Sequence, residues 1–146
     1  MRRTQLAVTS EATTVWSGGL TDGAGTTRLD SSKVAQFPVN WKARAEGEAG
    51  TTNPEELLGA AHSACFSMAF AKILTTAGYA PESIQATAAV TFEAGKGVLG
   101  SHLLVSARVP GLTEAEFEAL AEDAKQNCPI SQALAGIPIT IEAELA

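Results

Sequence analysis

The chain has 146 residues and a formal net charge of −6 at pH 7, and its ten lysines and arginines are scattered rather than clustered. This length fits one ordinary domain, residues 1–146, and the charge argues against nucleic acid or an anionic membrane surface as a partner. Hydrophobic residues make up 45% of the chain and charged residues 18%, which is typical of a soluble globular protein with a core.

Neither a leader nor a membrane anchor is expected. The start, MRRTQLAVTS, carries two arginines but no apolar stretch long enough for a signal peptide. We likewise expect no membrane-spanning segment, which would take a run of about 18 apolar residues. The predicted location is therefore the cytoplasm, where thiols stay reduced unless oxidation belongs to their chemistry. The two cysteines, Cys65 and Cys128, form no CxxC pair.

Short strands joined by turns are predicted for roughly residues 5–50, which are rich in Thr, Val and Gly. The stretch VNWKARAE alternates between two faces, which predicts a strand with one buried side. Arg44 belongs to the other side of this strand. The residues that share the predicted buried face are Val39, Trp41, Ala43 and Ala45.

A central helix is predicted from the stretch TNPEELLGAAHSACFSMAF. Asn53 is a suitable cap, Pro54 suits the first helical position, and the helix dipole favours Glu55 and Glu56 in the first turn. Residues 57–71 contain no charged side chain and are apolar nearly all round. Such a helix belongs at the centre of a fold, with other backbones close against it.

The remaining elements predict an α+β fold. Two alternating stretches, 84–92 and 103–109, read as strands, and a second helix begins at Thr113 with a capping box. A short turn or helix then runs through residue 134, followed by a last strand over 137–145. We expect antiparallel sheets wrapped around the buried central helix. Because so short a chain covers that helix poorly, we also expect a homodimer.

A reactive thiol at Cys65 needs a cation, because a thiol reacts as its thiolate. The helix dipole does not reach it, since Cys65 lies roughly 16 Å along the axis from Pro54 and the dipole effect fades within the first turn. Burial acts in the opposite direction by disfavouring the charged form. Arg44 is a candidate cation, and Glu55 is a candidate acid partner for it. His62 is interpreted as a satisfied core histidine.

Each of these residues also has an ordinary interpretation. Cys65 is then core filler, Cys128 belongs to a turn, Arg44 is solvated and Glu55 simply follows the helix dipole. A metal site built from two Cys and two His is a further alternative, although the chain lacks the short spacings that preorganise zinc. A protein of another class, a non-enzymatic dimer that binds a small ligand with unreactive thiols, also fits. The four residues of the metal alternative are Cys65, Cys128, His62 and His102.

Three separated stretches, WKARAEGEAG, TNPEELLGAAHSACFSMAF and NCPISQAL, resemble motifs of the osmotically inducible protein C (OsmC) family of thiol peroxidases. The sister branch, the organic hydroperoxide resistance (Ohr) proteins, looks similar around both cysteines but carries its key arginine after a Gly-Gly pair. In this chain Leu20 stands there, in SGGLTDG, and His62 is present where that branch tends to lack it. Both features favour the OsmC branch.

The resemblance implies an intertwined α+β homodimer and a role for each candidate residue. Cys65 would be the peroxidatic cysteine and Cys128 the resolving one, with a Cys65–Cys128 disulfide as the oxidised product. Arg44 would hold the thiolate, and Glu55 would orient Arg44.

The resemblance also implies the overall reaction. The enzyme would reduce organic hydroperoxides, and hydrogen peroxide more weakly, in defence against oxidative or osmotic stress. It would use no metal, haem or flavin, and an external dithiol, dihydrolipoamide or a lipoylated protein, would regenerate it. The apolar neighbours that we expect to line the substrate approach are Phe66, Met68, Phe70 and Ile130.

Overall fold

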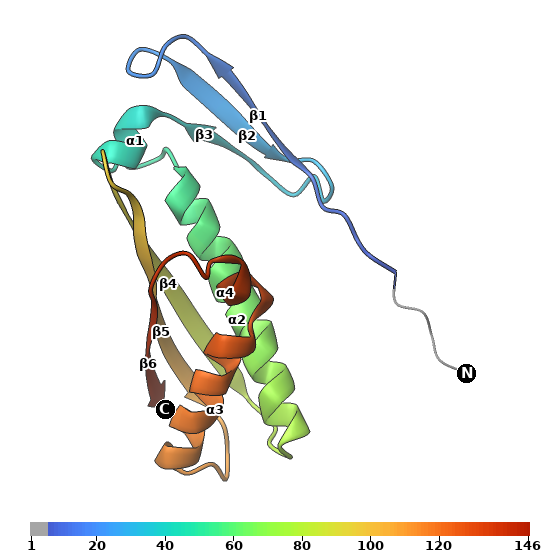
Figure 1. Ribbon diagram of the computed structural model, residues 1–146. Coiled ribbons are helices and arrows are strands. Elements are labelled where there is room, and N and C mark those ends of the chain that lie inside the picture. Colours follow the sequence, from blue (N-terminus) through green and yellow to red (C-terminus); the bar gives the residue numbers. More distant parts are fainter. Residues whose placement is uncertain (1–5) are drawn as a thin grey trace. The chain divides into compact units, whose positions relative to one another are not determined.

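The computed structural model describes residues 6–146 (Figure 1). The chain forms two compact units, the first ending at Asn53 and the second spanning Pro54–Ala146.

The first unit is a small antiparallel sheet of three strands that pair in chain order, followed by one helical turn. Trp16 lies opposite Gly25 across the first strand pair, and Thr27 lies opposite Phe37 across the second. The short strands expected for this region are thus present. Their bounds are β1 Ala12–Ser17, β2 Ala24–Leu29 and β3 Gln36–Val39, and the helix is α1 Trp41–Ala45.

The strand predicted through VNWKARAE is wrong beyond Val39, because the chain turns into α1 there. Asn40 is the helix N-cap, and its side-chain oxygen accepts a hydrogen bond from the Ala43 N–H at 2.7 Å. The Asn53 side chain donates to the Ala43 carbonyl at 3.1 Å. An asparagine before a short run of helix formers is a starting signal for a helix, and here it outweighs the alternation of apolar residues.

The second unit contains the central helix and a three-stranded sheet. The predicted start of the helix at Pro54 is confirmed. The predicted capping box is present as well, since the Glu116 N–H donates to the Thr113 hydroxyl at 3.2 Å. The elements are α2 Pro54–Thr76, β4 Ser83–Glu93, β5 Gly97–Arg108, α3 Glu114–Asn127, α4 Pro129–Ala133 and β6 Ile139–Leu145.

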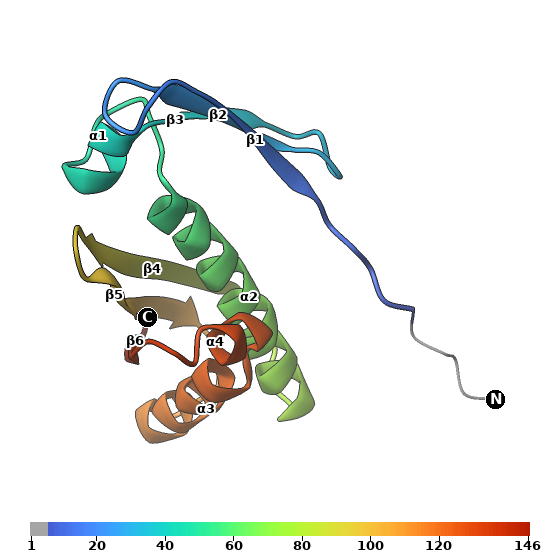
Figure 2. The same cartoon turned by 45° about the horizontal axis from the view of Figure 1, so that its top comes forward.

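The sheet of this unit has the order β4-β5-β6 and is mixed rather than wholly antiparallel. β4 and β5 form an antiparallel hairpin, whereas β6 runs parallel to β5, with Ser101 opposite Ile139. The expectation of antiparallel strands was therefore wrong for β6. The physical reason is the crossover through α3 and α4, which returns the chain to the end of the sheet where β5 began. Both α2 and α3 pack on this sheet, α2 chiefly on β4 and α3 on β6 (Figure 2).

The core of the second unit lies between these helices and the inward side of β5. Phe66, Phe70 and Leu74 have no exposed surface and follow one another at helical spacing along α2. The Phe70 ring lies 5.6 Å from that of Phe66 and 5.5 Å from that of Phe117 on α3, in the tilted geometry that aromatic pairs prefer. These aromatic contacts hold α2 against α3.

Only one stripe of α2 is buried among the described residues, although the helix is apolar nearly all round. Met68 on another side is 73% exposed. By length and composition alone α2 is also apolar enough to cross a membrane, contrary to the expectation from the sequence. The same criterion is met by core helices of soluble proteins, and the Phe66–Leu74 stripe of α2 is part of a core.

Candidate active site

Cys65 stands at the edge of the core on α2. Its side chain is partly exposed and packs against the buried cluster, one residue before the fully buried Phe66. α2 holds this position firmly because the aromatic side chains on its buried stripe are enclosed by β5 and α3. Cys65 is thus held by the core packing of α2 while it stays partly exposed, which is one of the conditions that a reactive cysteine requires.

Cys128 occupies the junction between α3 and α4 and has no exposed surface. Its backbone N–H donates to the Ala124 carbonyl at 2.9 Å and closes α3, while Pro129 opens α4 in the first-turn position that suits proline. The short helix expected through residue 134 is present, with Leu134 at its C-cap. This sharp corner between two helices directs Cys128 into the unit.

The structure brings the two cysteines together as thiols. The Cys65 thiol interacts with the side chain of Cys128 and accepts a hydrogen bond from the backbone N–H of Ile130. Both cysteines are unbridged. The pair is therefore poised for a disulfide, although the two residues are 63 positions apart in the sequence.

The surroundings of Cys65 do not favour its ionisation. Burial raises the pKa of the Cys65 thiol, the neighbouring Cys128 raises it further, and the Ile130 N–H lowers it in part. A buried anion is costly unless a cation or several donors compensate. Ionisation of Cys65 at neutral pH therefore requires positive charge in addition to these contacts.

Arg44 and Glu55, the predicted cation and its acid partner, lie in different units. Arg44 is partly buried on α1, and Glu55 is 5% exposed in the first turn of α2. A carboxylate this buried needs charge or hydrogen-bond compensation, and both residues make interactions. Their convergence on Cys65 stays a prediction.

The four predicted pocket residues fall into different environments. Phe66 and Phe70 are core residues without exposed surface in this structure, so their rings do not line an open approach to Cys65. Ile130 is partly buried and its backbone contacts the Cys65 thiol, whereas Met68 is largely exposed. A role in substrate binding stays a prediction for Met68 and Ile130.

His62, one turn before Cys65, is fully buried and satisfied, as expected of a core histidine. Its Nδ1 pairs with the Ser101 hydroxyl at 2.7 Å and its Nε2 with the Ser131 hydroxyl at 2.8 Å. Burial lowers the pKa of His62, so the ring is neutral at pH 7. The sequence did not reveal that His62 is hydrogen-bonded to α4, because Ser131 lies 69 residues away.

The alternative of a Cys₂His₂ metal site does not fit this geometry. Ser101, which contacts His62, is on the buried side of β5, whereas the next residue, His102, points to the other face and pairs with Thr140. Among residues 6–146, no group of three or more His, Cys, Asp or Glu side chains is placed to hold a metal.

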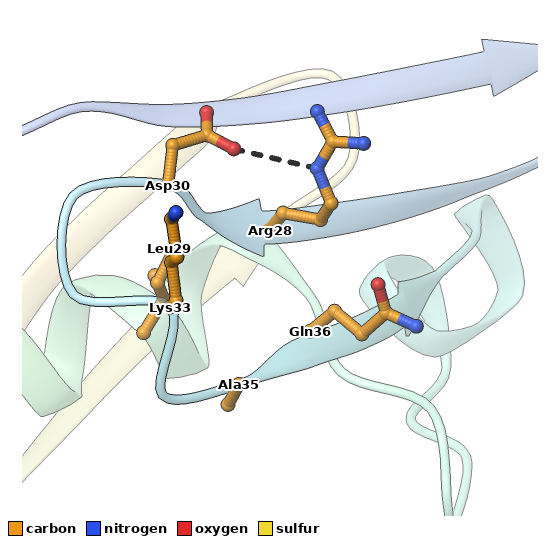
Figure 3. A pocket seen from close by; sticks show the side chains of 6 residues that line it. All are labelled: Arg28, Leu29, Asp30, Lys33, Ala35 and Gln36. Atoms are coloured by element: carbon orange, nitrogen blue, oxygen red, sulfur yellow. Dashed lines mark hydrogen bonds and ion pairs between the residues drawn. The ribbon is translucent and has the colours of Figure 1, made fainter.

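A separate shallow pocket lies wholly within the first unit, around the turn between β2 and β3 (Figure 3). Arg28 and Asp30 form an ion pair at its edge, at 3.3 Å. Neither cysteine lines it, and its six lining residues offer no nucleophile for redox chemistry. They are Arg28, Leu29, Asp30, Lys33, Ala35 and Gln36.

An α+β fold that holds two reduced cysteines in contact, one of them partly exposed, defines a thiol-redox class of protein. The family model described as OsmC-like protein matches residues 47–142. The chain is 41% identical over 133 residues to Peroxiredoxin OsmC of Escherichia coli (strain K12), an alignment that covers 89% of this chain and 92% of that protein. The chain belongs to the OsmC-like family.

Two further comparisons agree with this assignment. The chain is 34% identical over 119 residues to Organic hydroperoxide resistance protein OhrA of Bacillus subtilis (strain 168), covering 78% of this chain and 84% of that protein. The crystal structure of an OsmC-like protein from Mycoplasma pneumoniae has the same fold, with a TM-score of 0.73 at 16% identity, and covers 97% of this chain and 99% of that chain. The resemblance and the α+β, OsmC-like fold class predicted from the sequence are thereby confirmed.

Proposed function

We propose that this protein is a thiol-dependent peroxidase that reduces organic hydroperoxides, and hydrogen peroxide more weakly, through Cys65 and Cys128. The observation that carries the proposal is the contact between the partly exposed Cys65 thiol and the buried Cys128 thiol. The names of its relatives, a peroxiredoxin and an organic hydroperoxide resistance protein, support the same reaction class.

The proposed reaction has two steps in the protein. The Cys65 thiolate attacks one oxygen of the peroxide O–O bond; the alkoxide leaves and takes up a proton to become the alcohol, and Cys65 becomes a sulfenic acid. The Cys128 sulfur then attacks the Cys65 sulfur, water leaves, and a disulfide forms. The peroxide is reduced by two electrons and the two thiols are oxidised by two electrons.

Arg44 supplies the positive charge that Cys65 needs, and Glu55 holds Arg44 in place. Two observations support this. Burial and the contact with Cys128 raise the pKa of the Cys65 thiol, so its ionisation needs a cation, and Glu55 is a buried carboxylate that requires compensation. An arginine suits this role because it keeps its charge when partly buried and offers donors in a planar fork.

Regeneration uses an external dithiol, dihydrolipoamide or a lipoylated protein, and the proposed reaction needs no prosthetic group. The dithiol attacks the disulfide, forms a mixed disulfide, and leaves oxidised with both enzyme thiols restored. Rapid reduction by a dithiol also separates a catalytic bond from a structural disulfide, which resists physiological thiols.

We further propose that residues 1–146 act as one OsmC-like domain of an intertwined homodimer in the cytoplasm. The exposed apolar side of α2, which includes Met68, supports a second copy as its cover. Light scattering on the purified protein tests this, with the mass of two chains as the expected result and that of one chain as the contrary one.

A count of free thiols with intact mass tests the peroxidase directly, after a slight excess of cumene hydroperoxide is added to the reduced protein. We expect rapid loss of both thiols as one internal bond, abolished in Cys65→Ser and replaced by over-oxidation of Cys65 in Cys128→Ser. Two surviving thiols in the native sequence would contradict the proposal and favour the alternative, a non-enzymatic dimer that binds a small ligand.

A further inference from the structure

The histidine next to the thiol pair joins three elements of the second unit. From α2, His62 reaches Ser101 on β5 through Nδ1 and Ser131 on α4 through Nε2. All three side chains are buried, at 0%, 2% and 5% exposure. A neutral imidazole has one donor and one acceptor nitrogen, and a hydroxyl serves either one, so the chain of hydrogen bonds is fully satisfied.

The link between His62 and Ser131 runs beside the link between the two cysteines. His62 comes three residues before Cys65 on α2, and Ser131 comes three residues after Cys128 on the opposing segment. The two contacts therefore lie about one helical turn apart across the same α2–α4 interface. A shift of α4 that breaks one contact necessarily disturbs the other.

α4 depends on such links because it has little stability of its own. It spans five residues, and its N-cap, Cys128, makes no side-chain capping hydrogen bond. Helices this short do not persist by themselves. Besides the Cys65 contacts with Cys128 and with the Ile130 N–H, the His62–Ser131 hydrogen bond ties α4 to α2.

We propose that His62 is a positioning residue, which holds α4 through Ser131 so that the Cys128 sulfur and the Ile130 N–H stay against Cys65. The role of this arrangement in peroxide reduction rests on the proposed function. It acts on the second step, in which Cys128 attacks the sulfenic sulfur of Cys65, the S–S bond forms and water leaves. A better-held Cys128 shortens the life of the sulfenic acid, which further peroxide would oxidise irreversibly.

Two serine variants separate positioning from simple loss of stability. Ser131→Ala and Ser101→Ala each remove one buried hydroxyl and one hydrogen bond of His62, so we expect similar losses of stability. Only Ser131 connects His62 to α4. A merely structural role for the histidine predicts the same effect of both variants on the thiols, whereas positioning predicts an effect of Ser131→Ala alone.

The first measurement is the equilibrium between the Cys65–Cys128 disulfide and the dithiol in glutathione buffers, which does not depend on peroxidase activity. We expect Ser131→Ala to lower the effective concentration of the two thiols by about threefold to tenfold, as suits loss of one buried hydrogen bond. Ser101→Ala is expected to stay within about twofold of the native sequence on the same scale. Equal effective concentrations in the two variants would overturn the proposal. A higher effective concentration in Ser131→Ala than in the native sequence would overturn it as well.

The second measurement is the fraction of Cys65 that is over-oxidised at increasing cumene hydroperoxide, read by intact mass. Over-oxidation in Ser131→Ala should begin at about threefold to tenfold lower peroxide than in Ser101→Ala. If the native protein does not react with peroxide but Ser131→Ala and Ser101→Ala differ in glutathione buffers as expected, the proposed function fails and the positioning role stands. If peroxide is reduced and the two variants behave alike, the function stands and the positioning role fails.

Discussion

Residues 54–146 and residues 6–53 contribute different parts of the proposed chemistry. The second unit holds both cysteines in contact, and burial there raises the pKa of Cys65. The first unit lies before either cysteine and carries Arg44 on α1. The contrast shows that a preformed thiol pair is not the same as a reactive one. Packing brings the sulfurs together, but it works against the charge that makes one of them a nucleophile.

The largest effects are expected for substitution of the two cysteines, which belong to the second unit. With dihydrolipoamide as reductant, Cys65→Ser should lower cumene hydroperoxide consumption roughly a thousandfold or more, to the uncatalysed background, because the remaining thiol, Cys128, has no exposed surface from which to attack the peroxide. Cys128→Ser should allow one turnover and then stop. A Cys65→Ser protein that still turns over would move the chemistry to another group.

The next largest effect is expected for substitution of Arg44, which belongs to the first unit. Arg44→Gln should slow the reaction of reduced protein with cumene hydroperoxide by about tenfold to a hundredfold at pH 7, because loss of a nearby positive charge raises the pKa of the Cys65 thiol and so lowers the fraction of thiolate. Arg44→Lys should lie between, since it keeps the charge without the fork. Stopped-flow measurement of the first step reads this effect.

Arg28→Gln is the matched control for Arg44. Arg28 lies in the same unit, is about half exposed, and pairs with Asp30. We expect its replacement to leave the rate of the first step unchanged, because an exposed pair of this kind contributes little. Equal losses of rate in Arg28→Gln and Arg44→Gln would mean that general charge, rather than a specific arginine, activates Cys65.

Close packing of α2 on β4 gives a smaller effect, on stability rather than on rate. A Cβ at Gly59 would stand 2.8 Å from the Ala88 carbonyl oxygen. Glycine to alanine usually stabilises a helix by about 1 kcal/mol, but a backbone clash in a packed interface costs about 1–3 kcal/mol. We therefore expect Gly59→Ala to be neutral to destabilising by about 2 kcal/mol in urea unfolding followed by circular dichroism. A gain in stability would show that α2 and β4 pack less closely at Gly59 than a 2.8 Å approach to the Ala88 carbonyl requires.

The smallest expected effect is a pH dependence of stability from His62. Burial lowers the pKa of His62 below its ordinary value of 6.5, so the unfolded chain takes up a proton before the folded one does. The contribution of the neutral ring is complete above about pH 6.5 and is lost as the pH falls below it. His62→Gln should remove this part of the slope in urea unfolding at pH 5 to 7. An unchanged slope would contradict a neutral buried His62.

The helix that carries Cys65 could be predicted closely from the sequence, because its signals are local. Asn53-Pro54, the acids of the first turn and the uncharged run beyond them act over a few residues, as does the Thr113–Glu116 capping box. The fold class was reachable because the motifs resemble a family. The contact between Cys65 and Cys128 was implied by that resemblance and not by spacing.

The errors arose where a local pattern had two meanings or where the decisive contact was distant in sequence. Alternation around Arg44 indicated a strand, yet Asn40 caps a helix there. The parallel pairing of β6 depends on the crossover through α3 and α4, which an alternating stretch does not encode. Phe66 and Phe70 have no exposed surface in this structure, which the sequence pattern could not say because it does not show which side of α2 meets the sheet, and their role in substrate binding stays a prediction.

The activation of Cys65 by Arg44 is tested most directly by the pKa of Cys65, measured from thiolate absorbance at increasing pH in Cys128→Ser protein, where Cys65 is the only thiol. We expect a pKa below the ordinary thiol value, and a clear rise when Arg44→Gln is added, because the burial that raises the pKa then acts without its counter-charge. A high pKa that Arg44→Gln leaves unchanged would contradict the division of roles between the two units.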